Sequence, residues 1–152
     1  MKVVITHLLL LFFVFCTCPA IAQGYFIANA GTYISQDNFK TNDQKDISKY
    51  SGKYIAVSET YESNYTFNVT NKGEFLNIVV ISAGTMDGGE NWDTDTTTFD
   101  NISVKNGIFV METHGNKTFR FANVKYKPEG KNNYIGAEGI IMEEFFMFAE
   151  KE

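Results

Sequence analysis

The chain has 152 residues, with 18 acidic and 13 basic side chains and a formal net charge of −5 at pH 7. Its two cysteines, Cys16 and Cys18, both lie in the first 22 residues. The rest of the chain has no cysteine, which excludes a disulfide scaffold, a cysteine nucleophile and a zinc site of His and Cys. The excess of acidic over basic side chains argues against nucleic-acid binding.

The first 22 residues have the three parts of a secretory signal peptide. Lys2 gives a positive start, residues 3–15 are almost continuously apolar, and residues 20–22 form a small-x-small cleavage site. The apolar run is shorter than the roughly 20 residues that span a bilayer, so we expect no membrane span. The Ala-Gln junction resembles the signal ends of exported Bacteroidetes proteins. We expect a secreted or periplasmic protein; an uncleaved anchor and a lipoprotein signal are the alternatives.

Residues 23–49 are expected to form an N-terminal extension and a polar linker. The part up to Ser35 is apolar and aromatic, whereas residues 36–49 are polar and charged. The polar part is typical of a loop that could hold one helical turn.

Residues 50–152 are expected to form one all-β domain. After the leader, the chain contains a single leucine, Leu76, but many isoleucine, valine, phenylalanine and tyrosine residues, which favour strands over helices. Strand signals recur at the spacing of a β-barrel or β-sandwich. The expected strands are 53–60, 64–70, 74–82, 96–104, 107–114, 117–126, 133–141 and 144–149.

Local patterns support this division. Asn106-Gly107 between apolar runs predicts a type I′ hairpin, because that turn needs two positive φ angles. Residues 75–81 are apolar on both faces except at Asn77, which indicates a central strand. The last segment, 140–149, also fits helical spacing, so strand and helix both remain open.

The segment Gly52-Lys53-Tyr54 resembles the opening strand of lipocalins and related calycins, with Tyr54 in place of the family's tryptophan. The resemblance implies an antiparallel meander of about eight strands that closes into a small lipocalin-like barrel. A two-sheet β-sandwich of the same strands is the alternative.

An acidic, glycine-rich segment, residues 83–100, is the first candidate site. It holds Asp87, Glu90, Asp93 and Asp95 without a lysine or arginine, and it contains Trp92. Trp92 could anchor a ligand or protein partner, or it could cover the open end of the barrel.

The same segment has the alternate-residue spacing of oxygen ligands that begins a calcium loop. It is not an EF-hand, because Thr96 and Ile102 replace the required glycine and glutamate. We interpret it as a solvated acidic loop, with weak Ca²⁺ binding as the alternative, and expect no dedicated metal or other cofactor.

Two further residues are candidates for a barrel cavity. Tyr54 lies on the first strand of the expected barrel. Arg120, the only arginine, alternates with Phe119 and Phe121. It should face solvent if those rings face the core, or it could point inward and bind a carboxylate.

These features favour a non-enzymatic binding protein that holds a small apolar ligand or a protein partner. An inhibitor or immunity-type protein that blocks a secreted enzyme is the first alternative. A carboxylate-based hydrolase using Glu90, Asp93 or Asp95 is the second, and a Ser-His-Asp triad would have to use His114.

Overall fold

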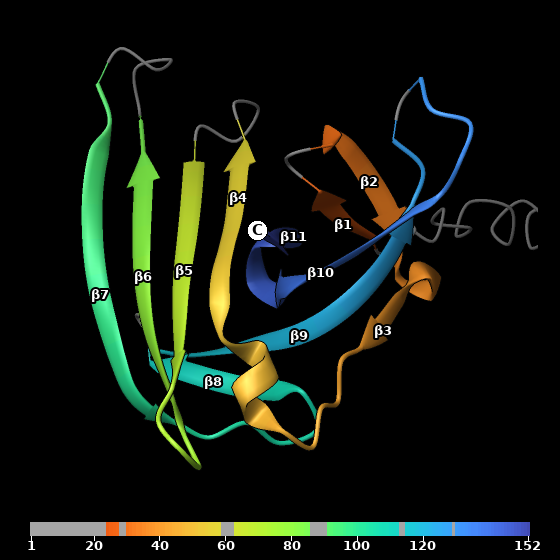
Figure 1. Ribbon diagram of the computed structural model, residues 1–152. Helices are drawn as coiled ribbons and strands as arrows, with labels where there is room; N and C mark the ends of the chain where they lie inside the picture. The colour runs from red at the N-terminus through yellow and green to blue at the C-terminus, as the bar shows by residue number, and fades with distance from the viewer. Residues whose placement is uncertain (1–23, 28–29, 59–62, 86–90, 113–114, 129) are drawn as a thin grey trace, which may run out of the picture.

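The computed structural model describes residues 24–27, 30–58, 63–85, 91–112, 115–128 and 130–152, and this part of the chain is all-β (Figure 1). Its strands are β1 (Gly24–Ile27), β2 (Thr32–Ser35), β3 (Phe39–Thr41), β4 (Gly52–Ser58), β5 (Ser63–Asn71), β6 (Leu76–Gly84), β7 (Asp93–Ile102), β8 (Ile108–Glu112), β9 (Asn116–Tyr126), β10 (Ile135–Met142) and β11 (Met147–Lys151). Short 3₁₀ helices are η2 (Gln36–Asn38), η3 (Ile47–Tyr50) and η4 (Glu143–Phe145).

These strands form one hydrogen-bonded sheet in the order β3-β9-β10-β11-β4-β5-β6-β7. In addition, β8 pairs with β9, while β1 pairs with β2 and, in parallel, with β11. The sheet is not closed, so the expected barrel is not confirmed. It bends so that β8 and β9 cross behind the lower part of the row formed by β4 to β7 in the view of Figure 1.

The expected strands of the 50–152 region correspond to β4 through β11. The strand expected to be central, β6, lies between β5 and β7. The ambiguous last segment is the end of β10, the short helix η4 and then β11. Phe146 takes a left-handed conformation (φ 51°) and ends η4, so β11 begins at Met147.

The main core lies between β4–β6 and the β8–β11 strands. It contains alternate residues of each strand, such as Phe67 on β5, Phe109 on β8 and Phe121 on β9. Tyr50, just before β4, stacks on Phe121 with ring centroids 4.0 Å apart. Burial of such large aromatic side chains contributes strongly to the stability of this fold.

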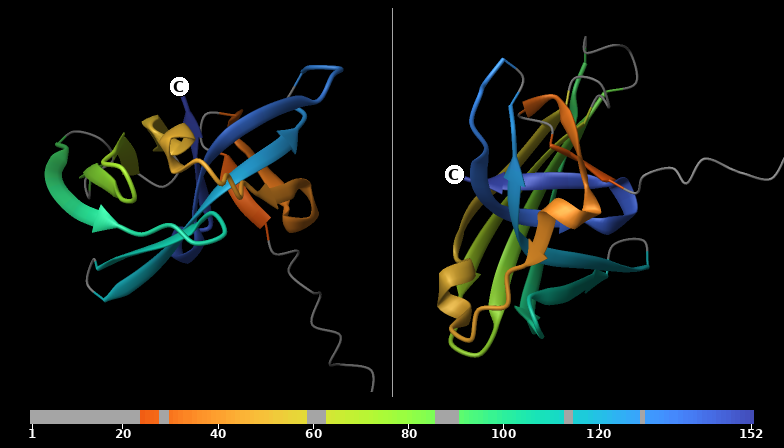
Figure 2. Two further views of the ribbon diagram at one scale, coloured as in Figure 1. Left: turned by 60° about the horizontal axis from the view of Figure 1, so that its bottom comes forward. Right: turned by 90° about the vertical axis from the view of Figure 1, so that its right-hand side faces the viewer.

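Residues 23–49 contribute more structure than their sequence suggested. Strands β1, β2 and β3 join the sheet and lie beside β9–β11 (Figure 2). Their apolar side chains pack with those of β9–β11 in a second core. This second core includes Tyr25, Ile34, Val124 and Phe148. The interpretation as a polar loop was wrong for β3 because a strand of three residues is too short to show an alternation.

The turn at Asn106-Gly107 is confirmed, with φ angles of 52° and 72°. The hairpin at this turn is short. Within the described residues, its two arms are joined by the single bridge between Lys105 and Ile108. Beyond that bridge, β8 turns away to pair with β9. The sheet therefore stays open between β7 and β8.

In the part of the chain covered by the structure, no helix has the length and apolar character needed to cross a membrane.

Candidate ligand-binding cavity

A cavity of about 230 Å³ lies on the concave side of the sheet. One wall comes from β5, β6 and β7, and the other from β8, β9, β10 and η4. Because side chains alternate across a strand, one face of each strand lines the cavity.

The first wall consists of cross-strand rows set by the sheet register. Val69, Ile78 and Phe99 form the row at the inner end, where Phe99 lines the cavity. Phe67, Val80 and Thr97 form the next row, and Tyr65, Ser82 and Asp95 form the third. The wall therefore changes from apolar to polar along the strands.

The opposite wall is formed by Met111, Phe119, Met142 and Phe145. The Phe119 ring stacks on the Phe109 ring with the two centroids 5.4 Å apart, and this contact fixes its position. Phe145 is 48 % exposed, and its ring lies 5.6 Å from that of Tyr65. These two rings thus meet across the outer end of the cavity.

A second hollow, of about 300 Å³ and more open, adjoins this outer end. It shares Tyr65, Ser82 and Asp95 with the first cavity, and it adds Ser63 and Asp93. We call this second hollow the mouth. Because the two hollows share three lining residues, we treat them as one site with an apolar interior and a polar entrance.

The structure brings together two of the acidic residues expected from the sequence. Asp93 and Asp95 lie on β7 with both side chains exposed at the mouth. Trp92 immediately precedes them and is 40 % exposed. Asp87, Glu90 and His114 lie outside the described residues.

The calcium interpretation finds no support in the geometry. Among the described residues, no group of three or more His, Cys, Asp or Glu side chains could hold a metal ion. Weak Ca²⁺ binding by the complete acidic segment stays a prediction.

Arg120 lies on the face of β9 opposite the buried Phe119 and Phe121 and does not line this cavity, so the expectation that it points into a cavity is not supported here. Its Nη2 atom lies 2.6 Å from Oε1 of Glu143, and the Tyr25 hydroxyl donates to Oε2 of the same carboxylate at 2.5 Å. Arg120 does bind a carboxylate, but this carboxylate belongs to the chain itself.

This cluster leads to a prediction about alkaline stability. Burial, and then the hydrogen bond to Glu143, raise the pKa of Tyr25 from 10 to about 12. The folded state thus holds the phenolic proton more tightly than the unfolded chain. Its contribution to the free energy of unfolding is complete below pH 10 and is lost as the pH rises through about 12.

Urea unfolding below pH 10 and near pH 12 should show this decrease, and Tyr25→Phe should make it smaller. An equal decrease in wild type and variant would contradict the assignment to Tyr25. Some dependence should remain in the variant, because burial also raises the pKa of Tyr54, Tyr50 and Tyr65.

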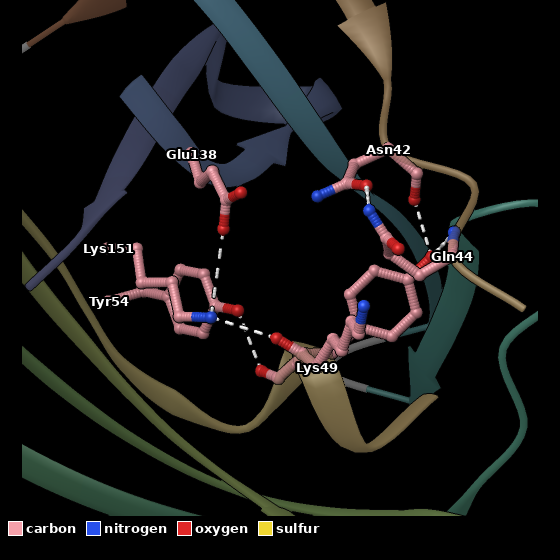
Figure 3. A network of polar contacts seen from close by, with 7 residues as sticks. Asn42, Gln44, Lys49, Tyr54, Glu138 and Lys151 are labelled. Atoms are coloured by element: carbon pink, nitrogen blue, oxygen red, sulfur yellow. Dashed lines mark hydrogen bonds and ion pairs between the residues drawn. The ribbon is translucent and has the colours of Figure 1, made fainter. Parts of the chain in front are cut away.

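Tyr54 lies in the main core and does not line the cavity. Figure 3 shows its surroundings. Its hydroxyl donates to the Tyr50 carbonyl at 2.6 Å, and the Lys151 ammonium lies 5.6 Å from its ring centroid. Lys151 also donates to the Lys49 carbonyl at 2.8 Å. Tyr54 therefore contacts both η3 and β11 from its position on β4. The expectation that it lines the cavity is not supported.

Several lining residues were missed at the sequence level. Met111, Phe119 and Met142 come from three different strands, and only the bend of the sheet places them opposite β5–β7. The sequence did contain one signal for the cavity wall. The alternation along β5 predicts that Tyr65 and Phe67 lie on the same face of that strand.

Comparison of the chain with known protein families, with curated proteins and with solved structures gives no match. The resemblance to lipocalins thus stays a prediction.

Proposed function

We propose that this chain is an exported, non-enzymatic binding protein that holds a small apolar ligand in the cavity between β5–β7 and β8–β10. The supporting observation is the cavity itself, with Phe67, Val80, Phe99, Met111 and Met142 in its walls. Its volume of about 230 Å³ is slightly below the roughly 300–1,000 Å³ of typical ligand pockets. The site therefore fits a small molecule, in a lipocalin-like manner.

The cavity favours this function over its alternatives. An inhibitor that acts through its acidic loop would need no hollow interior. A carboxylate-based hydrolase would need desolvated carboxylates that converge on one bond. Asp93 and Asp95 are instead exposed neighbours on one strand.

The experiment is a fluorescence titration with N-phenyl-1-naphthylamine, a neutral apolar probe that brightens when it leaves water. We expect saturable binding by the wild-type protein. Val80→Phe fills the cavity and should weaken binding by at least about tenfold. Val79→Phe is the matched control, because Val79 points to the opposite face of β6 and should leave binding unchanged.

Circular dichroism should show that both variants keep their β structure. Equal loss of binding in the two variants, or no saturable binding by the wild type, would contradict the proposed function.

A further inference from the structure

The polar end of the site is acidic. The row of Tyr65, Ser82 and Asp95 is followed, toward the mouth, by a row that consists of Ser63, Gly84 and Asp93. Alternate residues of β7 thus place two carboxylates on the same face, at successive positions along the entrance. The interior ends at the apolar Phe99, so the site is polarised along its length.

The lining of both hollows contains no lysine or arginine. The two cations on the nearest part of β9 already have partners. Lys117 pairs with Glu144, and Arg120 pairs with Glu143 on the other side of the sheet. A ligand carboxylate at the mouth would therefore meet two negative charges without a cation to balance them.

We propose that the ligand is a cationic amphiphile, with its apolar body in the cavity and an amine head at Asp93 and Asp95. This inference rests on the proposed function and adds the chemical class of the ligand. An ammonium group can donate hydrogen bonds to carboxylate oxygens, and the Ser82 and Tyr65 hydroxyls offer further acceptors. The attraction is modest because both carboxylates are exposed to water.

The test is displacement of bound N-phenyl-1-naphthylamine by three molecules with the same alkyl chain: octylamine, octanol and octanoate. We expect octylamine to bind roughly two- to fivefold more tightly than octanol, and octanoate to bind most weakly. Added salt should reduce the difference between octylamine and octanol.

The double variant Asp93→Asn/Asp95→Asn should remove the preference of the site for octylamine over octanol. Asp100→Asn is the matched control, since Asp100 lies on β7 beyond Phe99, at the end away from the mouth. This variant should keep the preference.

Two results would overturn the inference while the proposed function stands: octanoate binding as tightly as octylamine, or an unchanged octylamine preference in the double variant. Failure of the proposed function is distinguishable, because the probe itself would then not bind, or Val80→Phe would not weaken its binding.

Discussion

Gly139→Ala should destabilise the protein by about 3 kcal/mol or more, the upper part of the range for overpacked cores. Gly139 lies inside the sheet, paired with Ala122 on β9 and Glu150 on β11. A methyl group at this position would lie 2.2 Å from the Ala149 carbonyl oxygen and 2.3 Å from the Phe148 ring. Neither the backbone oxygen nor the buried ring can move away without breaking the pairing of β10 with β11.

Gly136→Ala is the matched control for this substitution. Gly136 lies on the same strand, but there a methyl group would approach no nearer than 3.9 Å to the Val124 carbonyl oxygen. Urea unfolding should show a large loss for Gly139→Ala and little change for Gly136→Ala. Similar stability of the two variants would mean that β10 and β11 are not packed as described.

Gly107→Ala is the second substitution with a large expected effect. Gly107 has a φ angle of 72°, which costs a residue with a side chain about 1–2 kcal/mol. Its methyl group would also lie 2.6 Å from the Asn42 carbonyl oxygen, and such overpacking adds about 1–3 kcal/mol. We therefore expect unfolding at clearly lower urea concentration than for the wild type.

Gly73→Ala separates the two contributions at Gly107. Gly73 has a similar φ angle of 82°, but nothing lies within 4 Å of the position that its methyl group would take. Its loss of stability should reflect backbone strain alone and should be the smaller of the two. Equal losses would show that the close approach of residue 107 to Asn42 is absent.

The strands from β4 to β11 could be predicted because each carries a local signal. Tyr65, Phe67 and Val69 alternate on β5, and Asn106-Gly107 marks a turn by its positive φ angles. Closure could not be predicted, because it depends on which strand edges meet after the sheet bends. The turn before β8 formed as expected and β8 pairs with β9 as a meander requires, but in the part of the chain that the structure describes no ladder joins β7 to β8.

The candidate site was predictable only in its polar part. Asp93 and Asp95 stand out in the sequence because they fall in an acidic segment, and they do lie at the mouth. The apolar walls combine residues far apart in the chain, such as Phe67 and Met142, and no local pattern connects them. Tyr54 was selected by resemblance to an opening strand, but its position is determined by packing against Phe121.

The most direct measurement of ligand binding in the cavity is NMR of methionine methyl groups during titration with N-phenyl-1-naphthylamine. Met111 and Met142 line the cavity, whereas Met147, the cross-strand partner of Met142, is buried in the same core without lining it. We predict saturable shifts of the Met111 and Met142 methyl signals, with a smaller shift at Met147. Saturation of probe binding without any shift at Met111 and Met142 would place the ligand elsewhere and contradict the account.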